Sequence, residues 1–256
     1  MNPSLRGLAR RILAVTRTAT YYLPWLSRSG LDCVLILNNV EARFRAGHRQ
    51  GPFPVSVVQY DADGTAVKRY EATLADSTDT AEVPLQPTAG GYGFVTVDVS
   101  RLQSDHYVTL SDGTTYAATH GRQEFIEQYP IWTRAVMALL GGALAQAGRT
   151  IPAFVRHQYA YAGPESHSHL LLLNLSNVAN RIRVTAHRDG VWAAGRLVRV
   201  PPMGAAFLDA GELAGPVAAG PAVLQLTLEG NAWFNLYLLG AGARGLTGPL
   251  SLMHVK

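Results

Sequence analysis

The chain has few cysteines, few charges and no long apolar runs. Cys33 is its one cysteine, so no internal disulfide can form. It lies in the apolar run 33–37, which indicates a buried, inert thiol and fits a reducing compartment. No stretch approaches the 18 or more apolar residues that a membrane-spanning helix needs. Arg10, Arg11 and Arg17 interrupt any signal-peptide core, so we expect a cytoplasmic protein; a place at the inner face of a membrane stays open.

The charge balance argues against one class of partner. Charged residues make up 16% of the 256 residues, and the net charge is +4. A nucleic-acid-binding protein needs a clustered basic face, and basic residues cluster only at the N-terminus, so we expect no nucleic-acid partner. A surface with few charges is either polar and neutral or covered by a partner. The length suits two domains of about 100–150 residues each.

Residues 1–20 are predicted to form a basic amphipathic helix. Its apolar residues recur at helical spacing, at Leu5, Leu8, Ile12 and Val15. We favour packing of this stripe on the same domain or on a sister subunit. The alternative is contact with a membrane surface or an acidic partner. The residues for that contact are Arg6, Arg10, Arg11 and Arg17.

Two long segments, 21–123 and 151–256, read as series of short strands separated by turn signals. Asp63-Gly64, Asp112-Gly113 and Asp189-Gly190 each predict a tight hairpin, because glycine tolerates a positive φ. The predicted fold class is therefore all-β, with two tandem antiparallel β-sandwich domains at these positions.

Residues 124–150 are predicted to form a helical connector between the two domains. Pro130 can begin a helix, and apolar residues follow it at helical spacing. The uncharged run 135–148 is too short to cross a bilayer. The apolar side of the helix must be buried somewhere, and Trp132 is a candidate partner contact.

The two halves share an order of landmarks. Apolar runs end in asparagine at 34–38 and 170–174, and hairpin signals follow at 60–64 and 186–190. Val-Pro steps follow at 83–84 and 200–201, and further turn signals lie at 110–116 and 227–233. The offsets drift, because the first half carries extra residues at 43–54 and 75–93. Four landmarks in one order predict an internal repeat.

The second half, 162–255, resembles the soluble sensory rhodopsin transducer family. The resemblance lies in the segment 163–169, the run 170–174, the turn at 189–190 and the Val-Pro step at 200–201. The first half resembles it more faintly, at 22–24 and 34–38. The family is usually single-domain. The resemblance implies small β-sandwich domains that form oligomers and act by binding partners, not by catalysis.

A polar and aromatic cluster is the candidate binding site. Period two places His157, Tyr159 and Tyr161 on one face of a strand, and His167 and His169 also share a face. Paired histidines can bind metal. However, the nearest acid is Glu165, and an apolar run stands where a further ligand would be needed. We predict no metal site.

Catalytic signatures are absent from the sequence. There is no Gly-x-Ser-x-Gly motif, and the glycine-rich segment 90–93 precedes a strand where a phosphate cradle needs a helix. The acids Asp61, Asp63, Asp189 and Glu229 fall at expected hairpin tips, where the turn explains them. We therefore predict a protein that is not an enzyme, with no catalytic residues and no cofactor.

Three functional hypotheses follow. The first is an interaction or structural protein that oligomerises, or docks on a larger signalling or membrane-associated assembly, with a protein partner or further copies of itself. The second is a carbohydrate- or small-ligand-binding module using exposed aromatic residues, namely Tyr159, Tyr161, Trp192 and Trp233. The third is a metal-dependent enzyme built on His157, His167 and His169.

Overall fold

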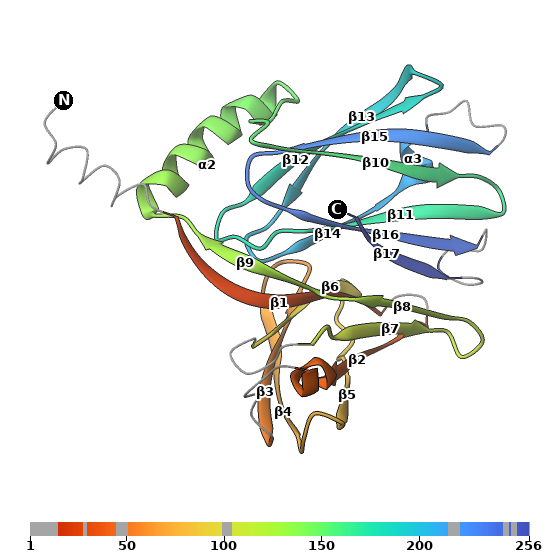
Figure 1. Cartoon of the computed structure of the whole chain (residues 1–256). Coiled ribbons are helices and arrows are strands. Elements are labelled where there is room, and N and C mark those ends of the chain that lie inside the picture. The colour runs from red at the N-terminus through yellow and green to blue at the C-terminus, as the bar shows by residue number, and fades with distance from the viewer. Residues whose placement is uncertain are drawn as a thin grey trace, which may run out of the picture.

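The computed structural model describes residues 15–27, 30–44, 51–98, 104–214, 221–242, 246 and 250–255. The described chain is mostly antiparallel β-structure in three sheets (Figure 1). The all-β fold class is therefore confirmed. The helical elements are η1 (Val40–Phe44), α2 (Ile131–Gln146) and α3 (Ala210–Leu213).

The first half contributes two sheets. The five-stranded sheet has the order β4-β3-β6-β1-β9, and the four-stranded sheet has the order β5-β2-β7-β8. Buried and exposed residues alternate along several of these strands, as expected for a sheet with one face in a core. The strands are β1 (Thr16–Leu26), β2 (Asp32–Asn38), β3 (Phe53–Asp61), β4 (Ala66–Leu74), β5 (Thr80–Pro84), β6 (Tyr92–Val97), β7 (Tyr107–Ser111), β8 (Tyr116–His120) and β9 (Arg122–Gln128).

The second half forms one eight-stranded sheet. Its order is β13-β12-β15-β10-β11-β16-β17, and β14 pairs with β11 outside this path. The pairing of β10 with β11 is confined to Ala162 and His167, so the sheet turns a corner there. The strands are β10 (Phe154–Ala162), β11 (Ser166–Leu173), β12 (Asn180–Arg188), β13 (Val191–Val200), β14 (Ala205–Asp209), β15 (Ala222–Gly230), β16 (Asn235–Gly242) and β17 (Ser251–Val255).

The strand pairings of the first half recur in the second. The path β4-β3-β6-β1 corresponds to β13-β12-β15-β10, and the path β5-β2-β7-β8 corresponds to β14-β11-β16-β17. Strand β9 adds to the free edge of β1 and has no counterpart among the described strands of the second half. Eight consecutive strands therefore pair in the same pattern in each half.

Two of the four sequence landmarks fall on equivalent strands, and two do not. The asparagine-ended runs lie on β2 and β11, and the turns at 60–64 and 186–190 join equivalent strand pairs. By contrast, Val83 lies on β5 and Val200 ends β13, which corresponds to β4. The hairpin expected at 229–231 is wrong, because β15 pairs with β10 and β12 and not with β16. There Asn180 accepts hydrogen bonds from the buried backbone of Asn231 and Ala232.

The two halves pack on a shared core. One core cluster combines first-half side chains such as Tyr22, Trp25 and Phe94 with second-half side chains such as Leu171 and Tyr237. A second cluster lies within the second half. Strand β11 separates the two clusters, since Leu170 and Leu172 enter one and Leu171 and Leu173 the other. A strand buried on both faces needs apolar residues at every position, which explains the unbroken leucine run.

The β3–β4 hairpin also docks on the second half. The backbone NH of Ala205 donates to the carbonyl of Ala62 at 2.9 Å. Gly64 has φ +84°, and a Cβ there would lie 2.0 Å from the carbonyl oxygen of Pro202. Glycine is therefore needed at Gly64 both for the turn and for the close approach of the two backbones.

Both predicted helical segments need correction. Residues 1–14 lie outside the described part of the chain, and the helix expected over 1–20 is wrong for 16–20, which begin β1. Thr16, Thr18 and Thr20 favour a strand, and β1 pairs there with β9. Within the connector 124–150, residues 124–128 belong to β9, whereas the helix after Pro130 is confirmed as α2.

Candidate interaction surface

Helix α2 turns its large apolar side chains away from the rest of the molecule. Trp132 is 68% exposed and Leu139 is 75% exposed, and Val136 and Leu140 are at least half exposed. These residues and Ala143 recur at helical spacing and form one stripe, which we call the outer stripe. In soluble proteins an apolar patch of this kind marks an interaction site.

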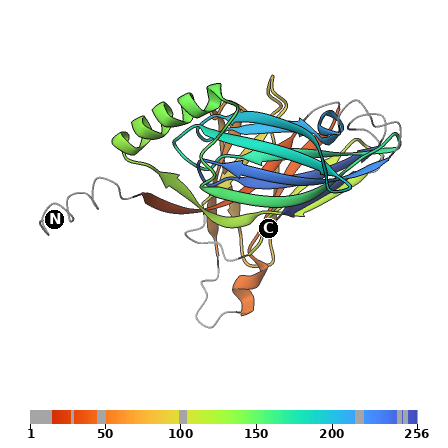
Figure 2. The same cartoon turned by 90° about the horizontal axis from the view of Figure 1, so that it is seen from above.

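The opposite side of α2 faces the sheet and carries small residues beside Arg134 and Met137. Gly141 is the buried residue of this fully described helix, and a Cβ at this position would lie 2.9 Å from Nη1 of Arg181 on β12. Figure 2 shows α2 lying across one end of the second-half strands. The helix thus makes its closest contact with the sheet at a glycine and leaves the large residues of the outer stripe exposed.

Hydrogen bonds before and after α2 hold it in place, and after it the Thr150 hydroxyl donates to the carbonyl of Arg181 on β12 at 2.6 Å. Before the helix, the side-chain amide of Asn177 bonds both the NH and the carbonyl of Tyr129, at 2.8 and 3.1 Å. After it, Gly148 has φ +65° and its NH donates to the carbonyl of Ala145, which closes the last turn. The outer stripe is therefore presented from a fixed position.

A buried carboxylate anchors the strand that leads into α2. Glu127 is 5% exposed and accepts hydrogen bonds from the guanidinium of Arg17, at 2.8 and 3.1 Å, and from the Tyr129 hydroxyl at 2.6 Å. Burial, and then the bond to Glu127, raises the pKa of Tyr129. Arg17, one of the predicted contact residues, thus forms an ion pair with the buried Glu127. Of the other predicted contacts, Trp132 lies on the outer stripe, and Arg6, Arg10 and Arg11 fall outside the described residues.

The predicted polar and aromatic cluster divides between two faces. His157, Tyr159 and Tyr161 alternate with less exposed residues on β10 and share the outer face of the sheet, as period two predicts. His157 Nδ1 lies 3.2 Å from the Thr227 hydroxyl on the neighbouring strand. Tyr161 is 37% exposed, the least of the large aromatic residues on this face.

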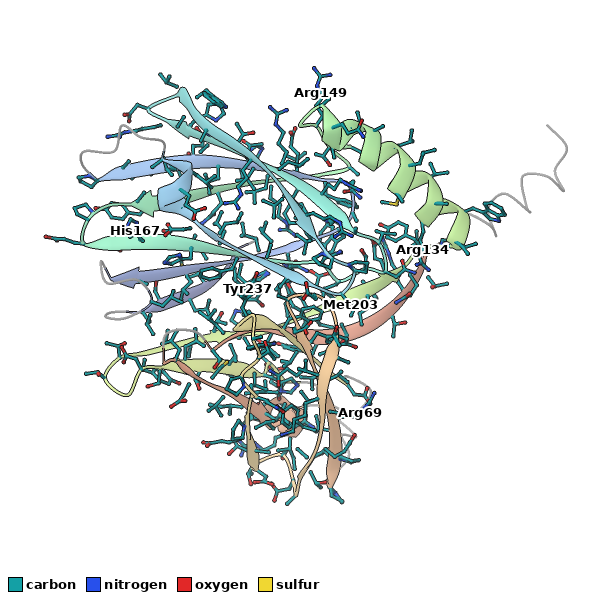
Figure 3. All side chains as sticks on the ribbon, turned by 180° about the vertical axis from the view of Figure 1, so that it is seen from behind. Arg69, Arg134, Arg149, His167, Met203 and Tyr237 are labelled. Carbon is teal, nitrogen blue, oxygen red and sulfur yellow. The ribbon has the colours of Figure 1, made fainter. Side chains whose placement is uncertain are left out.

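His167 and His169 lie elsewhere, on β11. They occupy the same face as Leu171 and Leu173, which points to the core shared by the two halves. The His169 ring stacks on Phe207 with centroids 5.1 Å apart. In Figure 3, His167 lies at the end of the second-half sheet that is far from α2. The structure therefore does not gather the five residues into one site.

The strand register reveals a row that the sequence alone could not predict. Tyr159 lies opposite Gln225, Gln225 opposite His187, and His187 opposite Trp192. Tyr159 and Trp192 are each 62% exposed. We call these four residues the aromatic row. Trp233 is not part of this face, because its ring packs edge-on against Phe154 and under the Arg156 guanidinium.

Other features of the described chain bear on the class of protein. No group of three or more His, Cys, Asp or Glu side chains among the described residues is placed to hold a metal ion. None of the helices seen there combines the length and apolar character needed to cross a bilayer. No protein-family model and no curated protein matches the chain.

Proposed function

We propose that this chain is a non-catalytic interaction protein built from two tandem β-sandwich units, and that two copies associate through the outer stripe of α2. The observation that carries the proposal is the exposure of Trp132, Val136, Leu139 and Leu140 on a helix that is fixed in place. Water contact with four large apolar side chains is unfavourable, and a partner that covers them removes it.

A second copy is the partner that best fits the chemistry of the stripe. Arg134 is the one charged residue between 131 and 146, and it lies on the cleft side of the helix. The stripe therefore offers no charge pattern that would select a foreign partner. In a twofold dimer the same patch meets itself, so an apolar stripe is its own complement. The resemblance to sensory rhodopsin transducers, which form oligomers, points the same way.

The size of the stripe suits one part of a dimer interface. Stable interfaces bury about 800 Å² on each partner, and the large side chains of α2 supply on the order of half of that. The repeated strand pairings support the tandem sandwich arrangement, with each eight-strand set folded around apolar residues.

Sedimentation velocity over a series of concentrations tests this proposal. We expect reversible dimers for the wild-type chain and monomers for Leu139→Glu, because a buried carboxylate without a partner is strongly unfavourable. Val191→Glu is the matched control, since Val191 is 69% exposed at the end of β13 opposite to Arg199, and its variant should still dimerise. A wild-type chain that stays monomeric, or equal dimerisation of Leu139→Glu, would contradict the proposal.

The aromatic row supports a second candidate function, carbohydrate binding. It crosses four adjacent strands, so Tyr159 and Trp192 stand about 14 Å apart, with two hydrogen-bonding side chains between them. Exposed rings that stack on sugars, with polar groups between them, suit a chain of a few sugar units. Glycan-array binding that is lost in Tyr159→Ala and Trp192→Ala, but kept in Tyr116→Ala on β8, would support it. No binding to any glycan would remove it.

A further inference from the structure

A cleft of about 390 Å³ lies between the inner side of α2 and the second-half sheet. Three arginines line it: Arg134 from α2, Arg181 from the start of β12 and Arg199 from the end of β13. No aspartate or glutamate is among its lining residues. Figure 3 shows Arg134 where α2 comes close to the strands. We call this feature the arginine cleft.

No described acidic residue neutralises the three positive charges. Among the described residues, the ion pairs of arginine involve Arg17, Arg122, Arg188 and Arg196, and none of the three cleft arginines. Arg181 and Arg199 also face each other directly across the β12–β13 ladder. Like charges at such a position repel and destabilise the sheet unless an anion lies between them. The charge pattern therefore matches a ligand with two or more negative charges.

The surroundings of Arg181 keep its guanidinium in the cleft. Its backbone NH donates to the side chain of Asn231, and its carbonyl accepts from the Thr150 hydroxyl at 2.6 Å. The guanidinium approaches α2 where Gly141 leaves room for it, since a Cβ at Gly141 would lie 2.9 Å from Nη1. The backbone is thus fixed on both sides, and the helix makes space for the charged end.

We propose that the arginine cleft binds a phosphomonoester group. Guanidinium groups form paired hydrogen bonds to phosphate oxygens, and a phosphomonoester carries up to two negative charges that three arginines can share. Arg181 and Arg199 contact the phosphate group from the sheet, and Arg134 contacts it from the helix. The ligand is either a free phosphorylated molecule or the headgroup of a phosphatidic acid lipid, because both present the same group.

Calorimetric titration with inorganic phosphate at constant ionic strength tests the proposal, alongside co-sedimentation with phosphatidic acid vesicles and with phosphatidylcholine vesicles. We expect Arg181→Met and Arg199→Met each to weaken binding about tenfold to hundredfold. Arg181→Lys should lie between wild type and Arg181→Met, because lysine keeps the charge without the paired geometry. The matched control is Arg149→Met, which changes an exposed arginine just beyond α2 and outside the cleft.

The phosphate titration and the vesicle co-sedimentation together distinguish a free phosphorylated ligand from a lipid headgroup. Tighter binding to phosphatidic acid vesicles than to inorganic phosphate assigns the lipid, and comparable binding assigns a free ligand. The wild-type arginine side-chain signals in NMR should also shift with phosphate, which keeps the test valid if a variant fails to fold. Binding of neither phosphate nor phosphatidic acid vesicles by the wild type would overturn the proposal. Equal weakening by Arg149→Met would overturn it as well.

Discussion

Two glycines in equivalent hairpins provide a direct measure of how firmly the two halves are joined. Gly64 ends the turn of the β3–β4 hairpin, and Gly190 ends the turn of the corresponding β12–β13 hairpin. Their φ values are similar, +84° and +78°. A Cβ at Gly190 would meet no atom within 4 Å, whereas a Cβ at Gly64 would lie 2.0 Å from the Pro202 carbonyl oxygen. Replacing Gly64 with alanine therefore tests the contact between the halves, and replacing Gly190 does not.

The expected magnitudes follow from this comparison. Alanine at a positive φ costs about 1–2 kcal/mol, and this cost applies to Gly64→Ala and Gly190→Ala alike. Gly64→Ala must in addition push the hairpin away from Pro202. That movement breaks the 2.9 Å hydrogen bond between Ala62 and Ala205 and loosens the packing around it. The hydrogen bond and the lost packing add about 2 kcal/mol, so Gly64→Ala should cost about 3–4 kcal/mol in total.

Urea denaturation of both variants, followed by circular dichroism and tryptophan fluorescence, provides the measurement. We expect Gly64→Ala to lower the free energy of unfolding by about 2 kcal/mol more than Gly190→Ala. Equal losses in the two variants would refute the reasoning, because they would mean that the hairpin does not bear on the second half.

Three further predictions concern buried polar groups. Burial lowers the pKa of His106 to about 4, so only the unfolded chain takes up this proton between pH 6.5 and 4. The free energy of unfolding in urea should therefore fall by up to about 3 kcal/mol as the pH drops through that window, and His106→Gln should reduce this pH dependence. Burial also raises the pKa of the Cys33 thiol to about 12, so a disulfide reagent should modify it only on unfolding, and rapid native labelling would count against this. The buried Asn174 donates to the carbonyls of Val178 and Pro201 at 2.7 and 2.8 Å, so Asn174→Ala should cost about 2–4 kcal/mol in thermal unfolding. The Asn38 amide donates at 2.8 Å to the Asp105 carbonyl and accepts only a long bond of 3.5 Å from the Val40 NH, so Asn38→Ala should cost about 1 kcal/mol.

Local signals in the sequence predicted much of the strand pattern. The Asp-Gly pairs at 63–64, 112–113 and 189–190 all mark hairpins whose glycines have positive φ, because that requirement depends on the turn alone. The helix after Pro130 was equally predictable from the sequence, because its apolar residues recur at helical spacing over a long segment. The strands β5 and β17 were missed, because five residues are too few for a periodic pattern to stand out.

Features that depend on distant partners were not predictable. The start of β1 is set by pairing with β9, about one hundred residues later, so its threonines could be mistaken for part of a helix. The alignment of Tyr159 with Trp192 passes through two intervening strands and exists only in the register. Likewise, Leu139 appears in the sequence as one of several apolar helix residues. Only the fold shows that Gly141, and not Leu139, faces the protein.

Distance measurement between spin labels tests the central claim, the pairing of α2 helices, most directly. Gln146→Cys places a label on an exposed residue beside the outer stripe, and the buried Cys33 should stay unlabelled. Packed helices have axes about 8–10 Å apart, and Gln146 lies about 12 Å along the axis from the middle of the outer stripe, so labels on two copies should lie within about 40 Å whether the helices run parallel or antiparallel. We predict such a short distance in concentrated samples and its loss in Leu139→Glu. Dimers in which the labels are far apart, or no dipolar coupling at all, would contradict the account.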